Sequence, residues 1–415
     1  MGQCASSSRN AQSEAQRPRE ETKPTLADMD FKLLIRQHSD FILPLFQQVA
    51  LREAQENVAL SPISITVTLA MVAAGATGAT LDQIVSCLHL STPAFLHDFA
   101  AQVRSVVLAD ASPHGGPLLS FANGVWVERT LPLQPSFVDT VKSKYAAVAQ
   151  PADFLNQAEK ARIEINTWTK NETKGIIEEI LPTGALDANS KCVLANALYF
   201  KGAWQNQFDT SLTAEEEFYL PNGKTLRVAM MTTNQKQEIT THDSFKVLRL
   251  PYNKSGDGRF FSMYIVLPHE RNGLLDVEKL VNVDFLEQKL VKSTEVKVRS
   301  FKLPRFKVSG GYEMPEVLGK LGLTLPFSNQ ANFSNMVNSP IGKSLSVDKV
   351  YHKAAVEVNE EGTVAAAATA AVVMLRSIQP MEDFVADHPF LFVLKEDMTG
   401  MVVFIGHVAS PTSQN

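Results

Sequence analysis

The interpretation of this chain depends on one segment near its end, which reads Glu360-Glu361-Gly362-Thr363-Val364-Ala365-Ala366-Ala367-Ala368-Thr369-Ala370-Ala371-Val372-Val373-Met374-Leu375-Arg376-Ser377. Two acids and a glycine open it, and no charged residue or proline lies between Gly362 and Leu375. Because alanine has the best intrinsic helix propensity, one interpretation is an alanine-rich or buried helix. The other is an extended strand, in which alternate side chains share one face.

As a strand, the segment would present a face made only of small side chains. That face consists of Thr363, Ala365, Ala367, Thr369, Ala371 and Val373. Such a strand can enter between two existing strands, because no large side chain on that face blocks its way. Gly362 would act as the hinge, since glycine tolerates the backbone angles of a turn. The pair Leu375-Arg376 would then be presented to a protease.

The segment resembles the reactive loop of the serpins, and most closely that of plant serpins, which often carry Leu-Arg before the scissile bond. Counted back from Arg376, Gly362 is the fifteenth residue and Thr363 the fourteenth, where inhibitory serpins have a hinge glycine and a small residue. The resemblance implies a reactive bond between Arg376 and Ser377, with Leu375 and Arg376 setting specificity. The implied hinge comprises Glu360, Glu361, Gly362, Thr363, Val364, Ala365, Ala366, Ala367 and Ala368. Many relatives have an acid in place of Val364, whose side chain we expect to point away from the inserted face.

Segments elsewhere in the chain support the same resemblance. The run 193–204 resembles a central-sheet strand of the serpins, and 387–392 with 399–408 resembles their carboxyl-terminal hairpin. Strands are also predicted at 121–127, 245–251, 261–268 and 296–304. A helix is predicted from 163 to about 180, and Ser61 before Pro62 is typical of a helix N-cap followed by proline at the first helical position. The matches cover roughly residues 30 to 411.

The resemblance implies an α+β, serpin-like fold with a large central, mostly antiparallel sheet, further sheets, about nine helices and an exposed reactive loop near the C-terminus. The expected parts are a disordered arm at 1–27, a single domain at 28–411 with the reactive loop at about 360–386, and a tail at 412–415. The resemblance also implies a polar cluster under the centre of the sheet, the shutter, formed by Ser61, Ser64, Asn196 and His352. Since buried polar groups must be paired, the shutter would penalise a half-open sheet.

Composition limits the function further. The 415 residues carry a net charge of -5 with both signs scattered, so no basic field suggests nucleic acid. No stretch is long and apolar enough to span a bilayer. The three cysteines, Cys4, Cys87 and Cys192, form no CxxC pair, and their odd number argues against a disulfide framework or a zinc site. We therefore expect no metal and no cofactor. The expected location is the reducing cytoplasm, and the alternative is an extracellular location reached by an unconventional route.

The first 27 residues form an arm rich in Ser, Gln, Glu, Arg and Pro, without the apolar core of a secretory signal. The arm begins Met1-Gly2-Gln3-Cys4-Ala5-Ser6, which matches the myristoylation pattern at Gly2 with Cys4 available for palmitoylation. This motif predicts membrane association, for which two acyl chains would be needed. The pattern is short enough to occur by chance.

The chain carries no sequence signature of an enzyme. We find no G-x-S-x-G elbow, no H-E-x-x-H and no glycine-rich phosphate loop in strand-to-helix context. The resemblance implies instead a monomeric suicide inhibitor that a target protease cleaves after Arg376 and that traps this protease in a covalent 1:1 complex. Trypsin-like serine proteases, and papain-like or metacaspase-type cysteine proteases, are the expected targets. The alternative is a non-inhibitory chaperone or ligand carrier with the same fold.

Overall fold

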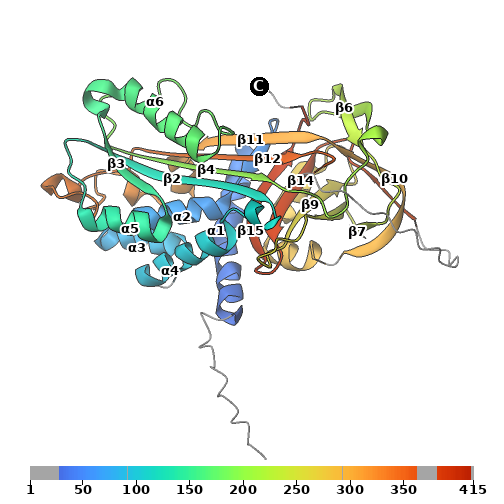
Figure 1. Ribbon diagram of the computed structural model, residues 1–415, viewed down its shortest axis with the longest axis horizontal. Helices are drawn as coiled ribbons and strands as arrows, with labels where there is room; N and C mark the ends of the chain where they lie inside the picture. Colours follow the sequence, from blue (N-terminus) through green and yellow to red (C-terminus); the bar gives the residue numbers. More distant parts are fainter. Residues whose placement is uncertain (1–27, 91, 292, 362–380, 413–415) are drawn as a thin grey trace, which may run out of the picture.

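The computed structural model describes residues 28–90, 92–291, 293–361 and 381–412 (Figure 1). Within these ranges, eight α-helices accompany short 3-10 and π-helical segments, in agreement with the expectation of about nine helices. The α-helices are α1 Asp28–Arg52, α2 Pro62–Ala73, α3 Gly78–Cys87, α4 Pro93–Gln102, α5 Pro135–Tyr145, α6 Phe154–Glu172, α7 Leu274–Leu280 and α8 Pro315–Lys320. None of these helices has the length and apolar character needed to cross a bilayer.

A five-stranded sheet forms one half of the molecule. Its strands, in spatial order, are β11 Phe306–Glu313, β12 Lys349–Val358, β4 Cys192–Lys201, β2 Leu118–Glu128 and β3 Val148–Ala152. Figure 1 shows α6 over one face of this sheet and α2 with α5 under the other. The sheet is mixed, because β12 runs parallel to β4 and β2 runs parallel to β3, whereas the other two pairs are antiparallel.

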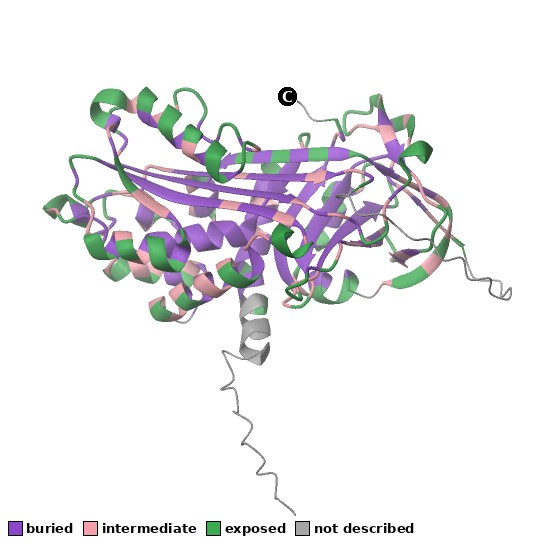
Figure 2. Ribbon diagram, in the orientation of Figure 1, coloured by how far each residue is buried: buried purple, intermediate pink, exposed green. Residues whose placement is uncertain are grey.

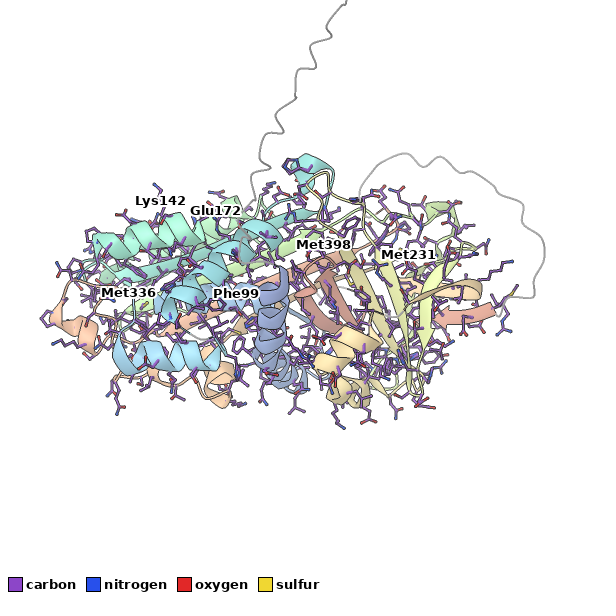
Figure 3. All side chains as sticks on the ribbon, turned by 90° about the horizontal axis from the view of Figure 1, so that it is seen from below. Phe99, Lys142, Glu172, Met231, Met336 and Met398 are labelled. Carbon is purple, nitrogen blue, oxygen red and sulfur yellow. The ribbon has the colours of Figure 1, made fainter. Side chains whose placement is uncertain are left out.

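A ten-stranded sheet forms the other half, and it is antiparallel apart from one pair. Its strands, in spatial order, are β1 Val58–Leu60, β15 Met401–Val408, β14 Phe390–Glu396, β9 Phe261–Pro268, β8 Phe245–Pro251, β7 Gln237–Thr241, β10 Thr294–Pro304, β6 Thr225–Met231 and β5 Ala214–Tyr219. The tenth, β13 Met381–Val385, runs parallel to β10. In Figure 3, Met231 marks the end of the molecule formed by this sheet and Met336 the end with the helices.

The burial of the strands explains their composition. Every residue of β4 from Cys192 to Phe200 is buried, because helices cover both faces, and its sequence is accordingly almost continuously apolar. Alternate residues enter two different apolar cores: Leu194 and Leu198 pack on the side of α2, and Ala195 and Ala197 on the side of α6. At the edge of the sheet, β11 alternates buried and exposed residues (Figure 2). Helix α2 lies wholly inside, with all its residues buried.

One local expectation was wrong. The helix predicted to continue to about residue 180 ends at Glu172, because Lys174 and Gly175 adopt the left-handed conformation, with φ of 54° and 84°. The amide of Asn166 then holds the returning chain by accepting from the backbone N–H groups of Ile180 and Leu181. Helix α2 begins at Pro62 with Ser61 at its N-cap, as predicted, and the side chain of Ser61 makes no capping hydrogen bond.

Candidate functional site

The junction between the two sheets contains the point from which the predicted loop departs. Strand β12 ends at Val358 and is followed by Asn359, Glu360 and Glu361, which we call the hinge junction. The next described residue, Met381, begins β13 in the other sheet. The described chain therefore stops beside β12 and β4 and resumes beside β10.

Three hydrogen bonds tie the hinge junction to the chain that follows β4. The indole of Trp204 donates to Asn359 O at 2.7 Å, and the backbone N–H of Phe208 donates to Glu360 O at 3.1 Å. The side chain of Gln207 donates to Glu361 O at 3.1 Å. Because β4 is the parallel neighbour of β12, these bonds hold the two strands together at one end. This is an end at which they would have to separate to admit another strand.

The carboxylate of Glu360 provides a further anchor at the same end. Its Oε1 accepts from Arg305 Nε at 2.5 Å and from the hydroxyl of Thr213. Glu360 is only 2% exposed. Burial favours the neutral acid, but the hydrogen bonds from Arg305 and Thr213 outweigh it, so the pKa of Glu360 lies below its usual value. The carboxylate is therefore ionised and paired at neutral pH.

A buried polar cluster lies farther along the same two strands, between the sheet and α2. The backbone N–H of Ser61 donates to His352 Nε2 at 3.1 Å, and His352 Nδ1 lies 2.6 Å from Asn196 Oδ1. The hydroxyl of Ser64 also donates to Asn196 Oδ1, at 2.9 Å. His352 and Asn196 are direct register partners on β12 and β4. Their hydrogen bond thus crosses between the two strands that would have to part.

The protonation state of His352 follows from these contacts. Because Nε2 accepts from a backbone N–H, the imidazole is neutral and its single proton is on Nδ1, from which it is donated to Asn196. Complete burial also lowers the pKa of His352 to about 3. A proton on Nε2 would oppose the Ser61 N–H group, so protonation is incompatible with the closed cluster.

A family model described as Serpin (serine protease inhibitor) matches residues 36–411. The chain belongs to the serpin family. This serpin is 51% identical over 361 residues to Serpin-ZXA of Oryza sativa subsp. japonica. The aligned region covers 86% of this chain and 91% of the relative. It is 48% identical over 360 residues to Serpin-ZX of Arabidopsis thaliana, over 86% of this chain and 92% of the relative.

Solved structures share the fold of this chain. Arabidopsis AtSerpin1 in its native stressed conformation superposes with a TM-score of 0.88 at 45% identity, over 92% of this serpin and 99% of that chain. Uncleaved ovalbumin superposes with a TM-score of 0.78 at 29% identity, over 91% of this serpin and 100% of the ovalbumin chain. The α+β serpin fold and the similarity to plant serpins inferred from the sequence are therefore confirmed. Membership in this family supports protease inhibition as the function.

The structure of this serpin brings together some of the predicted residues. Ser61, Ser64, Asn196 and His352 form one hydrogen-bonded cluster, as described above. Glu360 and Glu361 lie at the hinge junction. The remaining hinge residues Gly362, Thr363, Val364, Ala365, Ala366, Ala367 and Ala368, the residues Leu375, Arg376 and Ser377, and the acylation residues Gly2 and Cys4 lie outside the described residues.

Sequence reasoning missed the partners of the hinge junction. Nothing near Arg305 in the sequence indicates that it pairs with Glu360, which lies 55 residues later. It also missed Lys353 on β12, whose amine donates to Glu179 O at 2.7 Å in the loop after α6. Among the described residues, no group of three or more His, Cys, Asp or Glu side chains could hold a metal ion.

Proposed function

We propose that this serpin is an irreversible suicide inhibitor of proteases. A target protease cleaves after Arg376, and the freed segment from Thr363 onward enters the five-stranded sheet between β12 and β4 while the protease is still attached as an acyl-enzyme. The parallel pairing of β12 with β4 is the observation that carries the proposal. A segment that reverses direction at Gly362 would run antiparallel to both neighbours.

The two ends of the loop are anchored to different sheets, which gives cleavage a mechanical consequence. Upstream, the hinge junction continues directly from β12. Downstream, β13 is held by its parallel pairing with β10 in the other sheet. While the chain is intact, this second anchor limits how far the loop can move. Cutting between Arg376 and Ser377 removes that limit and leaves the downstream end in place.

Insertion supplies the driving force for inhibition. Each inserted residue gains hydrogen bonds worth about 0.5–1.5 kcal/mol net. About ten inserted residues would therefore release several kcal/mol, apart from the burial of side chains. The face with Thr363, Ala365 and Ala367 is small enough to pack within the sheet. Displacing catalytic groups of the protease by about 1 Å can cost on the order of a hundredfold in rate, so deacylation stalls.

The loop sequence sets the class of target. Arg376 fits proteases with an acidic primary pocket, as in trypsin-like enzymes. Leu375 adds an apolar preference at the preceding position, which suits papain-like cysteine proteases, and metacaspase-type enzymes also prefer arginine. We infer that the acceptor is the active-site serine or cysteine of such a protease and that the complex is covalent and 1:1.

Incubation with trypsin, and separately with a papain-like enzyme, followed by denaturing gel electrophoresis tests the proposal. An inhibitor gives a band at the summed mass of the two proteins, which survives denaturant because an ester or thioester joins them. A non-inhibitory chaperone or ligand carrier with the same fold gives only the cut chain and free, active protease. That second outcome with every protease that cleaves after Arg376 would overturn the proposal.

A further inference from the structure

Two buried amide nitrogens under the five-stranded sheet have no hydrogen-bond partner. They are Nδ2 of Asn123 on β2 and Nδ2 of Asn196 on β4. The two residues are directly opposite each other in the antiparallel β2–β4 pair, and their exposed fractions are 2% and 0%. Because a buried donor without an acceptor is destabilising, each of these nitrogens needs an acceptor.

The backbone N–H of Ser61 determines how Asn196 is oriented. This donor makes Nε2 of His352 an acceptor, so Nδ1 carries the proton and the Asn196 atom that faces it must be an oxygen. The oxygen of Asn196 therefore points toward β12. Since β4 lies between β12 and β2, the amide nitrogen points toward β2, where Asn123 lies.

The hydroxyl of Thr68 determines the orientation of Asn123. Thr68 Oγ1 lies 2.9 Å from Ser64 O and 3.1 Å from Asn123 Oδ1, so it contacts two acceptors with one proton. Turning the Asn123 amide by 180° removes this conflict. Thr68 then donates to Ser64 O, one turn earlier in α2, and accepts from Asn123 Nδ2. The oxygen of Asn123 then faces Asn196, whose Cβ lies about 4.5–5.5 Å away in such a pair.

We propose that Asn123 is a further positioning residue of the shutter: its amide oxygen accepts from Asn196 Nδ2, and its amide nitrogen donates to Thr68 Oγ1. Each donor atom named above then has at least one acceptor, and the one proton of Ser64 Oγ has two, Asn196 Oδ1 at 2.9 Å and Ser61 O at 3.0 Å. The resulting chain of hydrogen bonds runs from Ser61 N–H through His352, Asn196, Asn123 and Thr68 to Ser64 O. It connects β12, β4 and β2 with α2 in a single direction of donation.

The role of Asn123 in gating rests on the proposed function, whereas the hydrogen bonds do not. A strand that enters between β12 and β4 breaks the His352–Asn196 bond, while β2 and β4 remain joined along ten register pairs. Asn123 keeps the oxygen of Asn196 directed toward β12, ready to accept from His352 again. Without Asn123, the Asn196 amide can rotate and the closed sheet is less favoured.

Native-state hydrogen exchange of the backbone amides of β4 and β12 in the uncut, full-length chain tests this proposal. Thr68→Val removes the hydroxyl at nearly constant shape, and we expect exchange to become about 3- to 10-fold faster, which corresponds to the loss of one hydrogen bond. Asn123→Leu should accelerate exchange at least as much. Thr68→Ser restores the hydroxyl and should return exchange to the wild-type rate. Ser120→Ala, on the opposite face of β2, removes a buried hydroxyl that has no hydrogen-bond partner. It is the control and should not accelerate exchange.

The double variant Thr68→Val with Asn123→Leu should exchange more slowly than the product of the two single effects predicts, because the Thr68–Asn123 hydrogen bond that both changes remove can be lost only once. Multiplied effects, or wild-type exchange in Thr68→Val, would overturn the proposal. If Asn123→Leu does not fold, the comparison of exchange rates between Thr68→Val and Thr68→Ser tests the proposal without it. No protease enters this experiment, so a chain that fails to trap proteases but shows the coupling would overturn the proposed function and leave the hydrogen-bond chain intact.

Discussion

Glu360, just after the end of β12, forms an ion pair with Arg305, which lies between β10 and β11. Arg305 Nε donates to Glu360 Oε1 at 2.5 Å. The pair is asymmetric, because the carboxylate is buried whereas the Arg305 side chain is 46% exposed. Together with Trp204 and Phe208, it holds the hinge junction against both neighbours of β12. The end of the five-stranded sheet at the hinge junction thus depends on the buried carboxylate of Glu360, whose partner Arg305 is partly exposed to solvent.

We expect Glu360→Gln to lower the free energy of unfolding by about 1–3 kcal/mol, the cost of weakening hydrogen bonds at a buried group. Urea denaturation at pH 7 measures this. The contribution of Glu360 is present above the ordinary carboxyl pKa and is lost as the pH falls through its lowered folded value. Glu361→Gln, at an exposed neighbour, is the matched control and should change stability by less than about 0.5 kcal/mol. Equal effects of the two variants would contradict the assigned role.

His352 should make the folded chain less stable as the pH falls from 7 to 5. Its pKa is about 3 when folded, against an ordinary value of 6.5, so only the unfolded chain binds the proton in this range. The expected loss is about 2 kcal/mol at pH 5 from this residue. Urea denaturation at both pH values checks it. Buried His38, whose pKa is lowered to about 4, should contribute a similar loss of stability over the same pH range.

His352→Gln separates the two histidines. The variant is expected to be less stable at pH 7, but its stability should decrease less between pH 7 and pH 5 than that of the wild type. An unchanged decrease would mean that His352 is not neutral in the folded protein.

Arg376→Ala should abolish the trapping of trypsin-like proteases and leave the fold intact, because Arg376 is the only basic residue between Glu360 and Asp387. The gel assay for the covalent complex measures trapping, and urea denaturation checks the fold. Arg376→Lys should retain trapping, since lysine also fits an acidic primary pocket. Unchanged inhibition by Arg376→Ala would refute the assignment of the reactive bond.

Thr363→Arg and Ala365→Pro should convert the inhibitor into a substrate. A charge in the sheet interior is destabilising, and proline in a central strand removes a ladder hydrogen bond. Cleavage after Arg376 should stay fast, while the gel-stable complex is replaced by cut inhibitor and free protease. Val364→Arg adds the same charge on the other face of the strand and should still form the complex. If both hinge variants form it at the wild-type ratio, insertion from this hinge is not the mechanism.

Gly2→Ala tests the proposal that the chain is acylated in the cytoplasm and associates with membranes. The wild type should appear in the membrane fraction of expressing cells and the variant in the soluble fraction, because both acyl chains depend on the first. Gln3→Ala leaves the acceptor glycine in place and should partition like the wild type. Equal partition of all three forms would mean that the motif is a chance match.

The elements of the fold were predictable because their signals are local. The alternating strand β8, the apolar run of β9 and the Ser61-Pro62 start of α2 are all indicated by residues close together in the sequence. The prediction that α6 continues to about residue 180 was wrong for a different reason. The stretch from Thr173 to Ile180 is compatible with a helix, but left-handed residues and the Asn166 amide turn the chain back. That competition is decided by a contact across 14 residues.

The sequence by itself indicated the family, because its motifs are local runs of residues along one chain. The resemblance to that family implied the four shutter residues and the hinge and reactive-bond assignments, and those two assignments stay predictions. Only the tertiary structure decided that β12 and β4 are parallel neighbours, that Glu360 pairs with Arg305, and that His352 is neutral with its proton on Nδ1. The physical reason is that these properties depend on register and on hydrogen bonds between distant segments. Sequence periodicity places a side chain on a face, but the partner that accepts its proton is fixed only when the strands pack.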